Sequence, residues 1–169
     1  VLSEVYYDPA GSDDGFEWVE LYNDSAASVD LAGWSLGGGG NDYTYTVTQL
    51  AGLVPPYGCF VVGGPQSSAA NFNPVFDQAV AFDPNLQNSG STADGVALFS
   101  LPAGAVTASS IPAWVLVYGV TNSSGLIGPD GLVAPVSVGD VGQGNSVELG
   151  PTGWSSQNTP SPGDCSAAM

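Results

Sequence analysis

Three aspartates near the N-terminus are the residues best placed for metal chemistry. Asp8, Asp13 and Asp14 lie in a turn-rich segment, residues 8–15, and Glu17 follows shortly after it. Carboxylate oxygens close together on a flexible turn suit calcium, which takes oxygen ligands in variable geometry. The spacing differs from the twelve-residue calcium loop, and Asp-Asp-Gly is also common in ordinary turns. The segment is therefore a candidate calcium site, with turn formation as the alternative role of these aspartates.

Glu17 and Glu20 raise the question of a catalytic carboxylate pair. Two carboxyl groups flanking a scissile bond are the machinery of glycosidases. Residues 16–23 are rich in aromatic and β-branched residues and predict a strand, in which successive side chains alternate between two faces. Glu17 then shares a face with Val19, and Glu20 shares the other face with Trp18. We therefore assign no catalytic residue and expect the protein not to be an enzyme.

The composition excludes several classes of function. The chain has no lysine, arginine or histidine, and its 16 aspartates and glutamates give a formal charge of -16. Nucleic-acid binding relies on basic side chains that neutralise phosphates, and polybasic membrane anchoring needs the same residues. Serine–histidine triads, lysine Schiff bases and histidine-ligated zinc sites are equally excluded. We expect neither a nucleic-acid partner nor membrane insertion, since no apolar run approaches the roughly 20 residues of a membrane helix.

The two cysteines, Cys59 and Cys165, are far apart in the sequence. An even cysteine count is typical of disulfide-bonded secreted proteins. A bridge between them would attach the C-terminal tail to the core and stabilise the fold by roughly 4–5 kcal/mol in the loop-entropy model. We expect this disulfide, with two unpaired thiols as the alternative.

Short strands separated by turns predict an all-β fold. One helical turn is expected at residues 67–72, and the glycines at residues 37–40 predict a bend or flexible loop. With no linker in sight, we expect one β-sandwich domain over residues 1–169, built from roughly nine or ten short strands. The expected strands are residues 1–7, 16–23, 29–31, 34–36, 43–48, 59–62, 95–100, 113–120 and 146–149, with 75–82 as a further extended segment.

The aromatic residues are expected mainly in the core. Trp18, Trp34, Trp114 and Tyr45 all fall in predicted strands. Large aromatic side chains contribute strongly to the burial of small cores. A carbohydrate-stacking platform is the alternative use of these rings. The sequons at residues 23–25 and 122–124 also match the acceptor pattern for N-glycosylation.

Several blocks of the sequence resemble the lamin tail domain, an immunoglobulin-like sandwich of nuclear lamins and many secreted bacterial proteins. The most telling are Glu-Trp-Val-Glu-Leu-Tyr-Asn at 17–23 and Val-Asp-Leu-Ala-Gly-Trp-Ser-Leu at 29–36. The further blocks, in family order, are residues 5–9, 11–15, 53–58, 86–90, 95–98, 144–149 and 159–163. The glycine-rich segment 122–140 is longer than the family pattern, and the basic residues usual in lamin tails are missing. The resemblance therefore implies an immunoglobulin-like fold without a nuclear role, and it implies no reaction.

The expected function is that of an extracellular structural protein, secreted with its signal peptide removed, that assembles with copies of itself. Exposed sheet edges pair with other chains unless charge or proline blocks them, and lysine, the usual guard, is absent. The first strand is the predicted donor: Val1, Val5 and Tyr7 would share one face and fill pockets on a neighbour, with Leu2 on the opposite face. Pairing of residues 1–7 within their own sandwich is the alternative. The competing functions are a secreted adhesion or carbohydrate-binding module and an accessory domain of a secreted enzyme.

Overall fold

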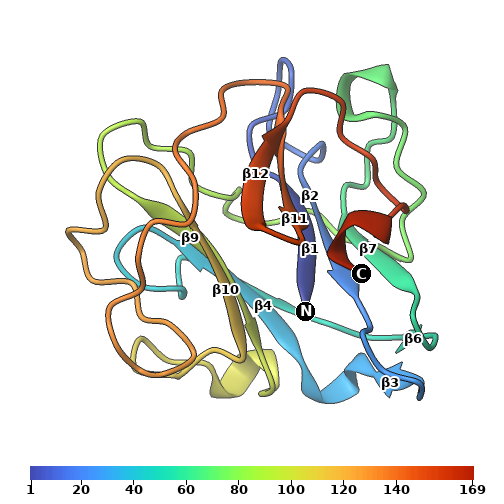
Figure 1. Cartoon of the computed structure of the whole chain (residues 1–169), viewed down its shortest axis with the longest axis horizontal. Coiled ribbons are helices and arrows are strands. Elements are labelled where there is room, and N and C mark those ends of the chain that lie inside the picture. The colour runs from blue at the N-terminus through green and yellow to red at the C-terminus, as the bar shows by residue number, and fades with distance from the viewer.

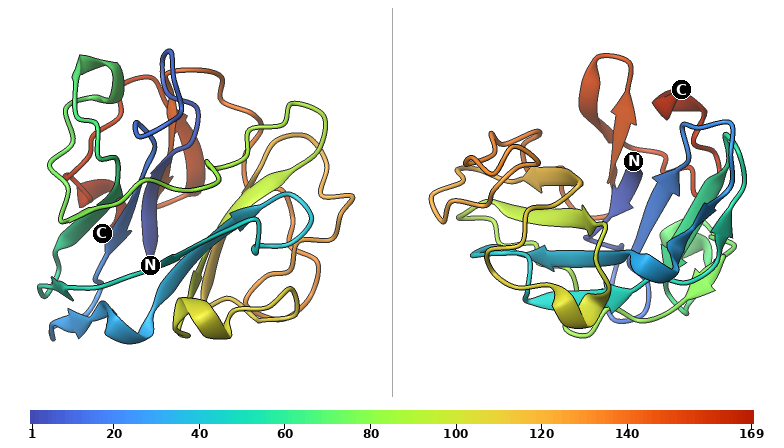
Figure 2. Two further views of the ribbon diagram at one scale, coloured as in Figure 1. Left: turned by 180° about the vertical axis from the view of Figure 1, so that it is seen from behind. Right: turned by 90° about the horizontal axis from the view of Figure 1, so that it is seen from below.

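Two β-sheets packed face to face make up the molecule. The computed structural model describes all residues 1–169 and shows the sheets as separate layers (Figures 1 and 2). The six-stranded sheet has the order β12-β11-β1-β2-β7-β8, the four-stranded sheet the order β10-β9-β4-β5, and β3 pairs with β6. The strands are β1 Leu2–Tyr6, β2 Trp18–Tyr22, β3 Val29–Asp30, β4 Ser35–Gly39, β5 Thr46–Gln49, β6 Leu53–Val54, β7 Cys59–Gly63, β8 Gln78–Ala79, β9 Asp94–Phe99, β10 Trp114–Tyr118, β11 Ser146–Gly150 and β12 Gly153–Gln157.

The predicted all-β sandwich is confirmed, with two differences in its elements. Nine strands have four or more residues, and three further strands of two residues each bring the total to twelve. Of the predicted segment 75–82, only Gln78–Ala79 is a strand. Short 3₁₀ turns also outnumber the single helical turn expected, because glycine and alanine-rich connections close into i→i+3 bonds. They are η1 Leu31–Gly33, η2 Ala69–Asn71, η3 Ala103–Ala105 and η4 Ser166–Ala168.

The central strand β2 is buried on both faces. Its alternation follows the prediction: Val19 and Leu21 enter the main core, whereas Trp18 faces away from it. The main core gathers side chains from both sheets, such as Phe60 of β7 and Leu116 of β10. Other segments must therefore cover the outer face of β2, because in a sandwich of two sheets alone this face would be exposed to solvent.

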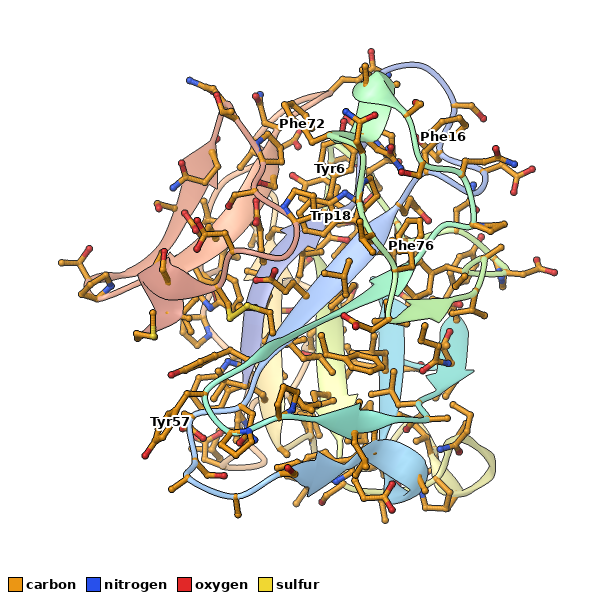
Figure 3. The ribbon with its side chains drawn as sticks, turned by 90° about the vertical axis from the view of Figure 1, so that its right-hand side faces the viewer. Tyr6, Phe16, Trp18, Tyr57, Phe72 and Phe76 are labelled. Atoms are coloured by element: carbon orange, nitrogen blue, oxygen red, sulfur yellow. A yellow bond between two sulfur atoms is a disulfide. The ribbon has the colours of Figure 1, made fainter.

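An aromatic cluster covers part of that outer face. Tyr6 stacks on Trp18 with ring centroids 5.5 Å apart, and Phe72 meets Tyr6 edge-on (Figure 3). Phe76 packs on the same cluster, beside η2. The Trp18 indole N–H donates to the carbonyl of Asn71, which satisfies the one polar atom of this ring. These four rings therefore serve the packing of the outer face of the sheet.

The first strand, β1, lies inside the six-stranded sheet rather than free at an edge. It pairs with β2 on one side and β11 on the other. A β-bulge between Leu2 and Glu4 shifts the alternation, so Leu2, Val5 and Tyr7 all enter the main core and are fully buried. The prediction that Leu2 opposes Val5 is therefore wrong. Val1, Leu2, Val5 and Tyr7 are not available as a donated strand, because their own sandwich already uses them.

The glycines of β4 form a strand rather than the predicted bend. A Cβ on Gly37 would stand 2.4 Å from the Tyr43 carbonyl, so the residues after the strand fold back against a backbone without side chains. Asp42 accepts the backbone N–H of Thr44 at 2.7 Å, which stabilises this turn in place of a ladder. The strand predicted at 43–48 consequently starts only at Thr46.

Two of the aromatic residues predicted to lie in strands and in the core, Tyr45 and Trp34, lie outside the strands. Tyr45 lies outside the strands and is 49% exposed. Trp34 follows η1, lies just before β4, and is only partly buried. Trp18 and Trp114 lie in strands as predicted.

The C-terminal tail folds back over the outer face of the six-stranded sheet. The predicted disulfide joins Cys59 of β7 to Cys165, with their Cα atoms 5.7 Å apart. The N–H of Cys165 also donates to the Cys59 sulfur. The last 3₁₀ turn, η4, packs near β11. The tail therefore spans the sheet from β11 to β7.

Candidate functional site

The acidic turn and a distant segment, residues 85–89, meet at one end of the sandwich. Glu17 is 2% exposed, and its Oε2 accepts the backbone N–H of Leu86 at 3.0 Å. Its other oxygen, Oε1, is buried and has no hydrogen-bond partner. Asp8 and Asp13 are half-buried and Asp14 is exposed. The candidate calcium residues thus lie beside a fully buried glutamate with a free oxygen.

A hollow of about 270 Å³ opens between the turn and this segment. Asp13 and Tyr45 line one side, and residues 85–89 line the other. Three bonds fix the segment: Gln87 Oε1 accepts from Gly40 N at 2.6 Å, its carbonyl accepts from the Tyr118 hydroxyl, and Ser89 N donates to Asp94 at 2.6 Å. The wall of the hollow is therefore rich in oxygen atoms held by the surrounding sheets.

Negative charge dominates the electrostatics of this site. Burial raises the pKa of Glu17 to about 9, and the charges of Asp13, Asp14 and Asp8 add to the shift. Burial also raises the pKa of Asp8, with Asp13 and Asp140 contributing, while a hydrogen bond from Asn88 opposes the rise. No basic side chain exists in the chain to compensate these charges. Only a proton or an ion from solution can do so.

The three predicted aspartates do not converge on a point by themselves. The one group of three metal-type ligand atoms within 4.8 Å of one another is Glu20 with Cys59 and Cys165. Both of those sulfurs belong to the disulfide, so that group is not a metal site.

A second pair of buried acids lies on the outer face of the six-stranded sheet. Glu4 and Glu20 are partners on adjacent strands, and each is 1% exposed. Glu4 accepts the hydroxyls of Ser146 and Ser161, and Ser161 N also donates to it. Glu20 accepts from the Ser3 hydroxyl and, at 2.7 Å, from Gly163 N. The two carboxylates therefore hold the tail, residues 159–165, against the sheet.

Burial makes these carboxyls hard to ionise. The pKa of Glu4 is raised to about 7, mainly by burial, with hydrogen bonds from Ser146 and Ser161 opposing the rise and the charges of Glu20 and Glu148 adding to it. The pKa of Glu20 is also raised by burial. Neither glutamate faces a pocket, and Glu17 lies on the other side of β2. The arrangement contains no carboxylate pair placed across a substrate site.

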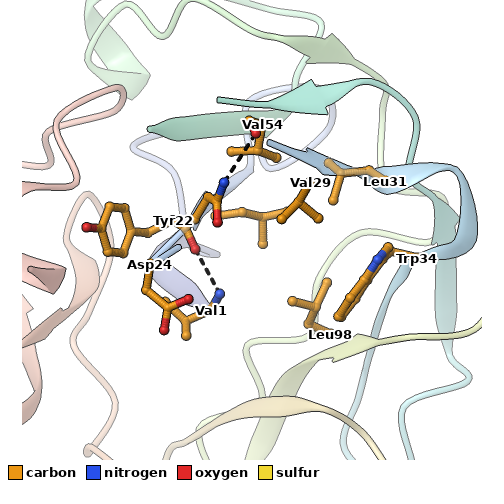
Figure 4. Close-up of a pocket in the computed structure, with 10 residues that line it drawn as sticks. Val1, Tyr22, Asp24, Val29, Leu31, Trp34, Val54 and Leu98 are labelled. Atoms are coloured by element: carbon orange, nitrogen blue, oxygen red, sulfur yellow. Dashed lines mark hydrogen bonds between the residues drawn. The ribbon is translucent and has the colours of Figure 1, made fainter. Parts of the chain in front are cut away.

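An apolar cavity of about 140 Å³ lies where β2 meets the ladder of β3 and β6. Its lining residues are mostly hydrophobic and include Leu21, Val29, Leu31, Trp34 and Leu98 (Figure 4). Two hydrogen bonds at its wall have backbone carbonyls as acceptors: Val1 N donates to the Tyr22 carbonyl, and Asn23 Nδ2 donates to the Val54 carbonyl. The cavity is mainly apolar, and Val1, with the terminal amino group, and Asp24 are also among its lining residues.

The sequence matches the family model of the lamin tail domain over residues 1–112. The chain belongs to the lamin tail domain family. No curated protein and no solved structure matches it. The family is an immunoglobulin-like structural domain, which agrees with the sandwich described above and supports a non-catalytic β-sandwich domain.

The part of this lamin tail domain beyond the matched residues completes both sheets. β10 pairs with β9, and β11 pairs with β1, so residues 113–169 supply one strand to the four-stranded sheet and two strands, β11 and β12, to the six-stranded sheet. No helix of this domain is long and apolar enough to cross a membrane.

The outer edge of β12 is one of the two edges of the six-stranded sheet, and the two-residue strand β8 forms the other. Beyond its ladder with β11, no backbone group of Gly153–Gln157 makes a hydrogen bond. The edge of β10, in contrast, is covered, since Ser137 N donates to the Val117 carbonyl and Gly119 N to the Val138 carbonyl. Figure 2 (right) shows the β11–β12 hairpin projecting from the rest of the molecule.

The side chains of this edge do nothing to block pairing. Ser155 and Ser156 are exposed, Trp154 packs against the main core, and the strand carries no charge. Prolines lie only outside it, at residues 151 and 160. Lysine, proline and inward-pointing charges are what usually protect such edges. Sequence reasoning missed this strand because its Gly-Trp-Ser-Ser-Gln pattern has little apolar alternation.

Both glycosylation sequons prove to be structural. Asn23 Nδ2 donates to the carbonyls of Ala27, Val54 and Pro55. Asn122 Nδ2 donates to the carbonyls of Leu126 and Ala134. These amide nitrogens hold turns together, so the sequon pattern here reflects loop geometry.

Proposed function

We propose that this lamin tail domain is a structural module of the extracellular space that associates with copies of itself through the open edge of β12. The observation that carries this proposal is an uncharged edge strand whose outward backbone groups have no partner. Strand addition would satisfy those groups with backbone hydrogen bonds from a neighbouring chain. The donated segment predicted from the sequence, residues 1–7, is replaced in this proposal by β12.

One further feature supports an extracellular role. The Cys59–Cys165 disulfide suits an oxidising compartment, because cytosolic thiols are kept reduced. The net charge of -16 opposes self-association, but screening limits repulsion to within roughly 8 Å at physiological salt. Association should therefore strengthen as the salt concentration rises towards and beyond that range.

Light scattering on the purified chain across concentration and salt tests the proposal. A variant with Ser155→Asp and Ser156→Asp places two carboxylates on the edge, which should abolish association while leaving a folded monomer. The matched control, Ser123→Asp with Ser124→Asp, adds the same charge at two exposed serines of another loop and should associate like the wild type. A wild type that stays monomeric at all concentrations would refute self-association and leave the binding-module and accessory-domain functions.

A further inference from the structure

The acidic end of the sandwich needs a positive charge that the chain itself does not contain. Glu17 is buried, yet its Oε1 has no hydrogen-bond partner. An ionised carboxylate oxygen left without a donor is costly in a protein interior. A protonated Oε1 would carry an O–H with no acceptor, which leaves the same atom unsatisfied. A bound cation would satisfy this oxygen and would supply the positive charge that no side chain of the protein carries.

The surroundings of Glu17 supply further oxygen ligands. Leu86, whose N–H binds the other oxygen of Glu17, lines the hollow together with Asp13 and Asn88. Asp8 lies close enough to Asn88 for the amide to stabilise its charge. Carboxylates, side-chain amide oxygens and water are hard ligands, and no sulfur or imidazole is near. This donor set selects a hard divalent ion over a transition metal.

The flexible geometry of the site favours calcium over magnesium. Calcium accepts 6–8 oxygens at irregular angles, whereas magnesium demands a near-ideal octahedron and retains its water. The carboxylates here come from a turn, and their oxygens are not gathered within 4.8 Å of one another. Calcium tolerates such a ligand set at the modest affinities typical of extracellular modules, with Kd on the order of 10⁻⁴–10⁻³ M.

We propose that Glu17 and Asp13, with Asp8 and Asn88 at the rim, bind one calcium ion between the acidic turn and residues 85–89. The observation that distinguishes this site from ordinary acidic turns is a buried glutamate with one oxygen lacking a partner and the other bound to Leu86, at the wall of the hollow. The ion links the β1–β2 connection to the segment that leads into β9 and so joins the two sheets at this end. The site is independent of the β12 edge.

Calorimetric titration of the chelator-treated, disulfide-intact chain with calcium chloride tests the proposal. We expect one ion per chain and a rise of about 5–10 °C in melting temperature at a calcium concentration near 100 times Kd. Magnesium chloride at the same concentration should give a much smaller rise, and sodium chloride at matched ionic strength should give none.

Two variants locate the site. Asp13→Asn and Glu17→Gln should each reduce the affinity at least tenfold, and Asp13→Asn does so at a half-exposed residue that the fold tolerates. The control Glu4→Gln alters an equally buried glutamate on the opposite face and should bind calcium like the wild type. Absence of calcium-dependent heat and melting shift up to 10 times the upper expected Kd, or unchanged binding in Asp13→Asn, would overturn the proposal.

Discussion

The buried carboxyl of Glu4 makes stability fall as the pH rises. Its pKa is about 7 in the folded chain, compared with an ordinary value of 4.5, so the folded state binds the proton more tightly between those values. The stabilisation is fully present below about pH 4.5 and is lost as the pH rises through 7. A difference of about 2.5 pKa units corresponds to about 3 kcal/mol of unfolding free energy. For a chain of this size, that is roughly 10 °C in melting temperature.

Urea denaturation at a series of pH values from 5 to 8 measures this loss. The groups facing Glu4 are Glu20 from β2, Glu148 from β11, and Ser161 from the tail. Glu4→Gln keeps an oxygen for Ser161 and cannot ionise, so its stability should depend less on pH by about 3 kcal/mol over this range. Glu148→Gln, at a less buried neighbour, should retain most of the wild-type dependence. An equally steep loss in Glu4→Gln would refute the assignment to this residue.

Three further predictions concern the fold. Reduction of the Cys59–Cys165 bridge, which closes a loop of 106 residues, should lower the unfolding free energy by about 4–5 kcal/mol in urea melts; an unchanged midpoint would contradict the role of the tail staple. Gly37→Ala should cost about 1–3 kcal/mol because its Cβ would meet the Tyr43 carbonyl, whereas Gly104→Ala, with nothing within 4 Å, should be nearly neutral by the same assay. Asn23→Ala should lower the free energy of unfolding by about 1–3 kcal/mol, because it leaves the carbonyls that Asn23 binds without a donor. A smaller change would mean that water takes the place of the amide.

The layer architecture was predictable because it depends on patterns that are local in sequence. The alternation of β2 places Val19 and Trp18 on opposite faces, and the structure agrees. The β1 pattern failed at a single residue, since a β-bulge near Ser3 reverses the alternation and no sequence signal marks it. The consequence is large: Leu2 belongs to the core, and the strand is unavailable to a neighbour.

The candidate sites were predictable only in part, because they join residues that are far apart in sequence. The acidic turn was visible from Asp8, Asp13 and Asp14, but its partner at Leu86 lies about 70 positions away. The hydrogen bonds between Glu4 and Ser161 join residues from nearly opposite ends of the sequence. The four consecutive glycines at residues 37–40 predict a bend or flexible loop, whereas Gly37–Gly39 belong to β4, because a strand made of glycine depends on what folds against it.

Electron microscopy of negatively stained, purified protein tests the central claim most directly. At physiological salt, pairing of one β12 edge with another predicts closed dimers for the wild type, because each chain offers a single β12 edge, and single subunits for the variant with Ser155→Asp and Ser156→Asp. Single subunits for both proteins, at concentrations where light scattering also finds only monomer, would contradict the claim that this lamin tail domain assembles with copies of itself.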